Sequence, residues 1–382
     1  MPTNLITLGS PAVGLADPDA LHADLGPEHP SRTGLLLVEV TTDGDDVVRA
    51  ARIQPGFNHR SAEKLFELRD YRQVLMLADR HDWHSPFSGE LGAALVCEHL
   101  MGLVPPQRAT WLRTVLAEQA RTTSHLAHLS AVCFLTGEEE LAADLRALRS
   151  TGRELVLAIS GNRVHPMLNR LGGLALDVPA GRLEQVAEWM DQAADLAGRL
   201  VEVLASSGLG RGLGIVDAAL VDDFGLSGPV AAASGLQRDL RLRNPYLCYD
   251  RMAEQLSAGF DPHSPGDAAA RFRELCRQVD ISSRLVRRCT EELAALDGPV
   301  DTKLSKIIKI PESEAYLAIE APWGMAGFHL VSRAGTTPWR LKLRTPSFAN
   351  VQALEQVLVG TPLQQVDVVL ASLGWTNGDL DK

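Results

Sequence analysis

The sequence predicts an α+β fold with an N-terminal β segment, a central helical bundle, and a C-terminal β meander with short helices. Two β-favouring runs flank the turn sequence TTDGDD, helical spacing of apolar residues dominates from residue 61 onward, and three short β-like segments follow Gly298 and Pro299. This pattern divides the chain into an N-terminal lead (1–24), an N-terminal β segment (25–60), a central helical domain (61–297) and a C-terminal α+β segment (298–382).

The N-terminal β segment is predicted to be a hairpin. Its two runs, LLLVEV and VVRAARI, are rich in Val, Leu and Ile, and the Asp-Gly pair between them favours a tight turn. A polar lead is expected up to about residue 25, before the first strand.

Long helices are predicted in the central domain at 107–130, 182–207 and 267–296. Prolines precede the first two, and Gly208 follows the end of the second, as is typical of helix boundaries. One face of the first helix is expected to carry Trp111, Leu112, Val115, Leu116, Gln119, Leu126 and Leu129.

The C-terminal segment is predicted to be a meander followed by helices. EAYLAIEAP, GFHLVSR and WRLKLRTP have the composition of short strands, and WGMA and AGTTP join them as turns. Short helices are expected at 348–358 and 363–373.

Composition limits the class of protein. Apolar residues make up 45% and charged residues 22% of the chain, as in an ordinary folded protein. The net charge of -11 argues against nucleic acid as a partner, because binding DNA or RNA needs a basic face. An acidic surface instead suits a protein that meets other proteins.

The sequence also predicts where the protein works. Asp, Glu, Arg or Gly soon interrupts every apolar run, so no stretch reaches the roughly 20 apolar residues of a membrane-spanning helix. The N-terminal residues lack the pattern of a signal peptide, so we expect a cytoplasmic protein whose contact with a membrane is peripheral. The five cysteines are dispersed, with no CxxC pair, which indicates reduced and mostly structural thiols.

Common cofactor signatures are weak or missing. The glycine-rich sequence GLGRGLG at 208–214 follows a predicted helix rather than a strand and lacks GxGxxG spacing, so a dinucleotide site is disfavoured. No GK[ST] phosphate loop is present, and we expect the chain itself to bind neither NADH nor ATP. A serine hydrolase is a weak alternative, because no GxSxG sequence occurs.

Two histidine pairs with i, i+3 spacing raise the question of a metal. They are His81 with His84 and His125 with His128. Neither pair has the HExxH form, and a further carboxylate or thiolate ligand is not evident. No metal is therefore expected, and polar residues at helix ends or interfaces are the favoured interpretation.

Several motifs in a fixed order carry a family resemblance that extends over about residues 24–382. They include GPEHP at 26–30, GFNHRSAEKL at 56–65, SGNRVHPMLNRLGG at 160–173 and LRTPSFANVQAL at 343–354. Together they resemble the 49 kDa subunit family, also called the D subunit, of proton-pumping type I NADH-quinone oxidoreductase, or respiratory complex I. The resemblance implies a fold like that of the nickel-iron hydrogenase large subunit.

The resemblance does not extend to hydrogenase chemistry. In hydrogenases two CxxC pairs hold the metal centre, whereas the equivalent stretches here are RHDWHS at 80–85 and SLGWTNGDLDK at 372–382. Neither stretch contains a cysteine, and a nickel-iron site needs thiolate ligands. Hydrogenase activity is thus excluded.

The resemblance implies a quinone chamber and its residues. The family offers a His after GPxHP, a Tyr after DRxD, and an Asp from the helix after SHL that supports the His. This chain has Thr33, Trp83 and Leu135 at those positions, and it keeps His29, Asp79, Arg80 and Asp82 nearby. Imidazole and phenol groups can protonate a reduced quinone, but a threonine hydroxyl is a much poorer acid and an indole cannot release a proton near neutral pH.

The resemblance also implies the cofactors and partners. Quinone is the substrate of the complex, and the terminal iron–sulfur cluster and the flavin belong to partner subunits, so this chain binds no cofactor itself. His59, Arg60 and Glu63 are the residues expected to face the cluster. For Arg60 and Glu63, a buried structural ion pair is the alternative.

Three functions remain open at this point. The first is a component like the 49 kDa subunit that serves electron transfer from NADH to quinone as part of a proton-translocating enzyme. Such a component is expected on the cytoplasmic side of the cell membrane, as a peripheral protein. The second is a structural or assembly paralogue without quinone chemistry, which the substitutions at Thr33, Trp83 and Leu135 favour. The third is a subunit of a related membrane oxidoreductase.

Overall fold

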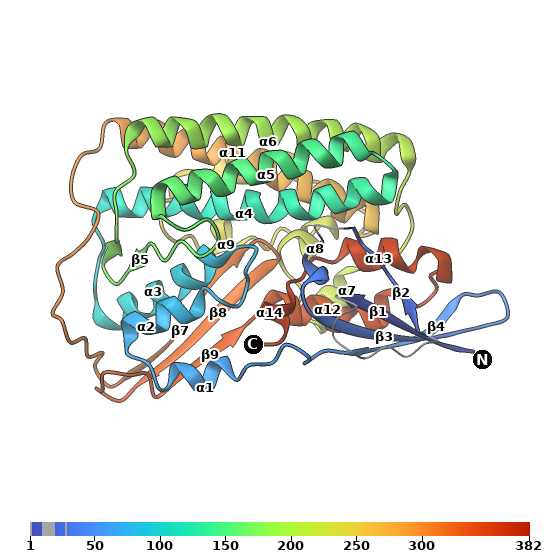
Figure 1. Cartoon of the computed structure of the whole chain (residues 1–382), viewed down its shortest axis with the longest axis horizontal. Helices are drawn as coiled ribbons and strands as arrows, with labels where there is room; N and C mark the ends of the chain where they lie inside the picture. Colours follow the sequence, from blue (N-terminus) through green and yellow to red (C-terminus); the bar gives the residue numbers. More distant parts are fainter. Residues whose placement is uncertain (1, 10–19, 27–28) are drawn as a thin grey trace.

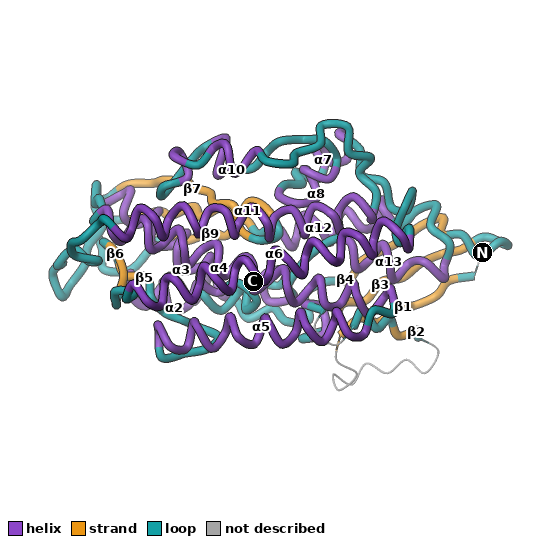
Figure 2. Tube along the Cα trace, turned by 90° about the horizontal axis from the view of Figure 1, so that it is seen from above, coloured by secondary structure: helices purple, strands orange, loops and turns teal. Residues whose placement is uncertain are grey.

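The computed structural model describes residues 2–9, 20–26 and 29–382. It confirms the α+β class. Figures 1 and 2 show long helices lying side by side across the molecule, with one sheet toward each end. One large apolar cluster includes residues from the N-terminal sheet, the long helices and the C-terminal helices, and a second cluster contains the buried residues of the C-terminal sheet.

The N-terminal sheet contains the predicted hairpin together with further strands from the lead. Its order is β2-β1-β3-β4, with β3 antiparallel to both β1 and β4. The strands are β1 (Thr3–Gly9), β2 (Leu21–His22), β3 (Leu35–Thr42) and β4 (Val48–Gln54). The expectation of a lead without a strand is therefore wrong, because β1 pairs along its whole length with β3. Residue 1 and residues 10–19 of that lead lie outside the described residues.

Four long helices form the bundle in the described part of the chain, and three of them confirm the predicted helices. They are α4 (Gln107–Thr136), α5 (Glu139–Ser160), α6 (Ala180–Ser207) and α11 (Ala268–Ala294). Helix α4 packs against the other three. Its burial is not restricted to one apolar face, because Arg113, Glu118 and His125 on it are also buried.

Shorter elements connect the bundle to the sheets. They are α1 (Ala62–Phe66), α2 (Tyr71–Ala78), α3 (Pro86–Met101), β5 (Asn169–Arg170), β6 (Gly173–Leu174), α7 (Ala218–Asp223), α8 (Gly228–Ala233), α9 (Leu240–Arg243), α10 (Ala253–Ser257) and the 3-10 helices η2 (Pro30–Arg32) and η3 (Tyr249–Arg251). Helix α3 packs on both α4 and the C-terminal sheet, so the loop between α2 and α3 lies where the bundle and that sheet meet.

The C-terminal meander is confirmed. Strands β7 (Ser313–Ala321), β8 (Gly324–Ser332) and β9 (Arg340–Arg344) pair antiparallel in sequence order. Helices α12 (Pro346–Val357), η4 (Leu363–Gln365), α13 (Val366–Ser372) and α14 (Asn377–Leu380) follow. Helix α12 packs on β4, so the end of the chain returns to the N-terminal sheet (Figure 1).

The glycines of GLGRGLG shape a turn that caps α11. Gly210 and Gly212 have positive φ values of 75° and 70°, which residues with a side chain rarely adopt. The Gly212 N–H donates to Asp267, the N-cap of α11, and the Ala269 N–H donates to the Gly210 carbonyl. These glycines therefore have a structural explanation.

Two helical glycines should respond oppositely to substitution. A Cβ at Gly89 in α3 would lie 2.0 Å from the Ala78 carbonyl oxygen, whereas a Cβ at Gly198 in α6 would meet no atom within 4 Å. Gly89→Ala should lower the free energy of unfolding by about 1–3 kcal/mol through overpacking. Gly198→Ala should raise it by about 0.5–1 kcal/mol through helix propensity. Urea denaturation measures both, and equal effects would contradict the α2–α3 packing.

Candidate functional site

The C-terminal segment 375–381 is the centre around which the predicted site residues gather. The Asn377 side-chain amide donates to the carbonyls of Ser31 and Thr33 at 3.0 and 2.8 Å, and the Trp375 indole N–H donates to the Asn377 side-chain oxygen at 3.0 Å. The loop that carries Thr33 is thus attached to the end of the chain by buried hydrogen bonds. Thr33 itself is exposed.

The loop between α2 and α3 meets the same segment from another side. Asp82 Oδ1 accepts hydrogen bonds from the backbone N–H groups of His84 and Ser85 and from the Thr376 hydroxyl at 2.9 Å. The Trp83 ring lies against Gly378, where an added Cβ would be 2.1 Å from it. The structure therefore brings the neighbourhoods of Thr33, Asp82 and Trp83 together.

Asp79 and Arg80 form an ion pair at the start of this loop. The Asp79 side chain is fully buried, and its second oxygen lies 3.6 Å from His165 Nδ1. Arg80 also directs one nitrogen toward the sulfur of Met167. Residues 165 and 167 belong to the motif block 160–173. The sequence analysis identified this block only through the family resemblance.

His29 is buried in a cluster of aromatic and imidazole rings. Its Nδ1 lies 2.6 Å from the Ser31 hydroxyl, and its ring centroid lies 4.8 Å from that of His128 and 5.4 Å from that of Trp375. Burial and the neighbouring His128 lower the pKa of His29 well below its ordinary value. His29 is therefore neutral at pH 7 and orders the loop rather than carrying charge.

Leu135 lies in the last turn of α4 and packs against the apolar core. The loop of Thr33 passes over the same end of the helix, because a Cβ at Gly26 would lie within 3.3 Å of Ala131 and Phe134. Pro27 and Glu28 of GPEHP are outside the described residues.

Two of the three residues expected to face a cluster line a hollow beside Leu380, Asp381 and Lys382. The hollow includes His59 and Glu63, and Asp381 accepts from the N–H groups of Gly56 and Asn58. Arg60 is exposed and donates to the Arg80 carbonyl at 2.7 Å, which links the two groups of candidates.

The alternative of a buried Arg60–Glu63 ion pair is wrong. Glu63 is instead bound by Arg340 at 2.5 Å and by the Leu343 N–H at 3.0 Å. Because Glu63 holds β9 rather than Arg60, the Arg60 guanidinium stays at the surface of the chain.

The histidine pairs are packed into interfaces. His125 and His128 lie in the second half of α4 and pack on Trp323, and His128 Nε2 contacts the Ala371 carbonyl at 2.6 Å. His81 is buried beside Phe66. Among the described residues no group of three His, Cys, Asp or Glu side chains could hold a metal ion. All five cysteines are buried and free.

Asp82 is a titratable group of this site with a pKa near neutrality. Burial and the neighbouring Asp379 carboxyl raise its pKa to about 7. A raised pKa in the folded state stabilises the fold at acid pH, and this contribution is lost as the pH rises through about 7. Asp82→Asn should therefore raise the melting temperature at pH 8 relative to the wild type, and this gain should be smaller at pH 5. An equal change at both pH values would contradict the assignment.

The polar residues of the C-terminal segment are the part of the site that the sequence analysis missed. Thr376, Asn377, Asp379 and Asp381 make many of its contacts, whereas the sequence drew attention to 372–382 only through the lack of cysteine. A run of Thr, Asn and Asp immediately after an apolar helix was the available signal. The partners of Thr376 and Asn377, however, are 294 and 346 residues away in the sequence.

This arrangement is a site built between a helical bundle and two sheets, with buried carboxyl, imidazole and indole groups. The sequence model of the family described as respiratory-chain NADH dehydrogenase, 49 Kd subunit, matches residues 145–308 and 302–382. The chain therefore belongs to this family of oxidoreductase subunits.

Curated relatives agree over nearly the full length. The second D-type subunit of NADH-quinone oxidoreductase from Salinispora arenicola is 42% identical, with 99% of this chain and 98% of the relative aligned. The first D-type subunit from Streptomyces coelicolor is 40% identical over all of both chains. The D-type subunit from Desulforamulus reducens is 32% identical, over 94% of this chain and 97% of the relative. Within the described ranges, every helix is too short or too polar to cross a membrane.

Proposed function

We propose that this chain forms part of a quinone chamber in NADH-quinone oxidoreductase, next to the terminal iron–sulfur cluster of a neighbouring subunit. In that setting it serves electron transfer from NADH to quinone, coupled to proton translocation, on the cytoplasmic side of the cell membrane. The observation that carries the proposal is the convergence of Thr33, Asp82 and Trp83 on segment 375–381.

The chemistry available at this site is proton donation and hydrogen bonding. Reduction of a quinone to a quinol takes up two electrons and two protons, and this chain carries groups for the proton part only. Asp82, with a pKa of about 7, can hold a proton at neutral pH, and the Trp83 indole can donate a hydrogen bond without releasing its proton. The electrons, the cluster and the flavin belong to partner subunits.

Arg60 supports the expected position of the cluster. It is an exposed cation anchored to the Arg80 carbonyl, beside the loop of Asp82. A fixed positive charge near an iron–sulfur cluster stabilises its reduced state and raises its reduction potential. His59 and Glu63 line the same side of the chain and complete the surface offered to the neighbouring subunit.

A second candidate is a structural or assembly paralogue that contacts the same partners without quinone chemistry. Thr33, Trp83 and Leu135 favour it, because none of these side chains can exchange a proton at neutral pH. The retained contacts of segment 375–381 are compatible with either function.

Affinity purification of the tagged chain from native membranes separates these functions. Co-elution of an iron–sulfur subunit with inhibitor-sensitive NADH:quinone reductase activity supports the quinone chamber. Co-elution without activity, while the remaining membranes keep theirs, supports the structural paralogue. Recovery of the chain alone refutes both. Arg60→Gln tests the cluster-facing surface, since it should lower the cluster's reduction potential in the purified complex.

A further inference from the structure

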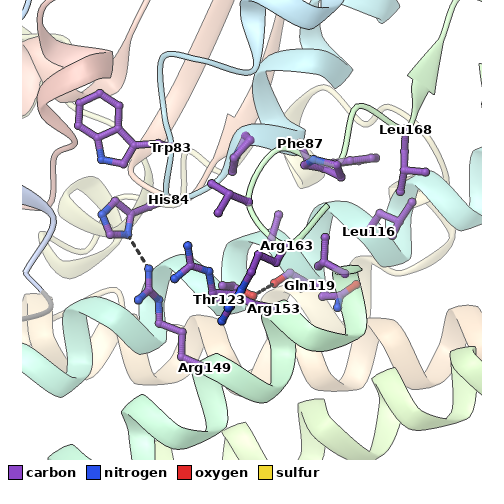
Figure 3. A pocket seen from close by; sticks show the side chains of 15 residues that line it. Trp83, His84, Phe87, Leu116, Gln119, Thr123, Arg149, Arg153, Arg163 and Leu168 are labelled. Atoms are coloured by element: carbon purple, nitrogen blue, oxygen red, sulfur yellow. Dashed lines mark hydrogen bonds between the residues drawn. The ribbon is translucent and has the colours of Figure 1, made fainter. Parts of the chain in front are cut away.

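Buried titratable side chains of this chain differ in whether they can hold a proton at neutral pH. Burial lowers the pKa of the buried histidines, and that of His84, which lies against Arg149 in Figure 3, is about 3. Burial has the opposite effect on carboxyl groups, because it disfavours the charged form. The pKa values of Glu90 and Glu320 are raised to about 7 and about 8. A proton-binding group other than Asp82 is therefore expected among the buried carboxyl groups.

The hydrogen bonds of the two glutamates favour different protonation states. The Glu90 carboxylate accepts from the Met167 N–H at 2.6 Å, the Asn169 N–H at 2.9 Å and the Asn169 amide at 3.3 Å. Glu320 is 4% exposed, and in the described part of the chain its carboxyl accepts only from the Leu240 N–H, at 2.9 Å. Each donor stabilises the ionised form, so Glu320 has the weaker support for a negative charge.

The guanidinium groups around Glu320 are already paired with other carboxylates. Arg241 binds Asp239 at 2.7 Å and Glu118 at 3.1 Å, and Arg121 binds Glu118 at 3.2 Å. Among the described residues, no cationic nitrogen lies within 4.0 Å of the Glu320 carboxyl oxygens. An ionised Glu320 would thus be a third carboxylate facing two cations. An unpaired buried charge is costly, so the neutral acid is favoured.

The remaining charged and titratable groups that face Glu320 do not pair with it. Arg344 on β9 lies between Glu320 and Asp379, but its guanidinium nitrogens donate to two backbone carbonyls. The Tyr246 hydroxyl accepts from the Glu320 backbone N–H at 3.0 Å, and the Tyr249 hydroxyl donates to a carboxylate of the bundle. Burial raises the pKa of both phenols, so both are neutral.

We propose that the folded chain binds a proton on the Glu320 side chain at neutral pH and releases it to water as the pH rises. This carboxyl joins β7 to α9 through the Leu240 N–H, and the Tyr246 hydroxyl holds the adjoining backbone. Loss of the proton places a negative charge near that of Asp239, the N-cap of α9. Glu320 is thus a pH-sensitive contact between the C-terminal sheet and segment 239–249.

The Glu320 site is distinct from the carboxyl pair of the proposed quinone chamber. Asp82 has Asp379 as its acidic neighbour, whereas Glu320 has Asp239. Binding of a proton at Glu320 needs only the folded chain, so it can be tested without partner subunits or quinone. Failure of this proposal would leave the proposed function intact, and the reverse also holds.

Urea denaturation of the purified full chain at pH 5.5 and pH 7.5 tests the site. The pKa of Glu320 is raised from 4.5 to about 8 in the folded chain, so folding takes up a proton between these values. The stability that Glu320 contributes is full below pH 4.5 and is lost as the pH rises through about 8. Glu320→Gln keeps a neutral group of similar shape. The unfolding equilibrium constant of the wild type, divided by that of Glu320→Gln, should therefore rise about fiftyfold between the two pH values.

The ratio isolates Glu320, because Asp82 and the other titrating groups are common to both proteins. Glu312→Gln, at an exposed position just before β7, is the matched control, and its ratio to the wild type should stay constant with pH. A constant ratio for Glu320→Gln as well would overturn the proposal.

Hydrogen exchange of the wild type gives a second measurement that needs no variant. Between pH 7 and pH 9 the backbone amides of segment 239–249 should lose protection relative to those of α5, which share the general effect of pH on exchange. In a folded Glu320→Gln variant this relative loss should be absent. Unchanged relative protection in the wild type, or the same loss in the variant, would contradict the proposal.

Discussion

Thr33→His, Trp83→Tyr and Leu135→Asp, introduced together, are expected to raise NADH:quinone reductase activity of the assembled complex by about a hundredfold or more. A positioned general acid contributes about 10²–10⁴-fold to a proton-coupled step, and the three changes restore an imidazole, a phenol and a carboxylate. The Thr33 and Trp83 loops already meet at segment 375–381, so the new groups have a common place to act.

The three positions differ in how easily they accept the change. Thr33 is exposed, so an imidazole there needs no new space. Trp83 packs on Gly378, and the smaller phenol leaves room at that contact. Leu135 is partly buried, and an Asp there loses apolar contact, so the triple variant should be somewhat less stable than the wild type.

Activity per assembled complex is the quantity to measure, with assembly quantified by the co-purified iron–sulfur subunit. The matched control replaces Leu135→Asp by Leu135→Asn in the same triple variant. An amide cannot stabilise an imidazolium as a carboxylate does, so most of the gain should disappear. No gain in an intact complex that contains the triple variant would show that these positions do not form the head-group site.

Glu118→Gln is expected to give the largest loss of stability, about 3–5 kcal/mol in the free energy of unfolding. The Glu118 carboxylate is fully buried in the bundle and accepts hydrogen bonds from Arg241, Tyr249 and Ser282, the last two at 2.5 and 2.6 Å. The amide removes one of the two carboxylates that compensate the buried guanidinium groups of Arg241 and Arg121, so that Asp239 alone remains paired with Arg241. An uncompensated buried charge is more costly than the loss of one hydrogen bond.

The pH dependence distinguishes a charge effect from simple repacking. Arg241 and Arg121 oppose the cost of burial and lower the pKa of Glu118 from 4.5 to about 2. A lowered pKa in the folded state contributes stability above the unfolded pKa, and this contribution is lost as the pH falls through about 2. The difference in unfolding free energy between the wild type and Glu118→Gln should therefore have its largest value at pH 7 and should decrease below pH 4.5.

Urea denaturation at pH 7 and at pH 3 measures this difference. Glu202→Gln, a substitution of the same kind at an exposed position of α6, should change the free energy of unfolding by less than about 0.5 kcal/mol. A Glu118→Gln variant as stable as the Glu202→Gln control would mean that the buried network does not hold the bundle together.

The local sequence pattern was sufficient to predict most of the long helices and the strands. Three of the four long helices of the bundle, the N-terminal hairpin and the three-stranded meander are predicted near their observed bounds, because proline, glycine and apolar periodicity act over a few residues. The order of the motifs was also sufficient to identify the family. The match to the 49 Kd subunit model and the relatives confirm this assignment. The quinone-chamber and cluster-facing roles stay proposals.

The local sequence pattern failed to predict strands and buried side chains whose contacts lie far away in the sequence. Strand β1, with the sequence TNLITLG, was not predicted, and the fold pairs it along its whole length with β3. Polar residues of α4 such as Glu118 resemble those of a solvated face, yet Glu118 is buried because Arg241 and Ser282 meet it in the fold.

The sequence by itself determined three of the four long helices, the meander, the family and the substitutions at Thr33, Trp83 and Leu135. Only the tertiary structure decided that segment 375–381 organises the site, that Glu63 binds Arg340 rather than Arg60, and that the buried Glu320 carboxyl meets the Leu240 N–H. The physical reason is that helix caps, turns and periodicity are local, whereas a hydrogen bond such as that from Asn377 to Thr33 exists only after distant segments pack together.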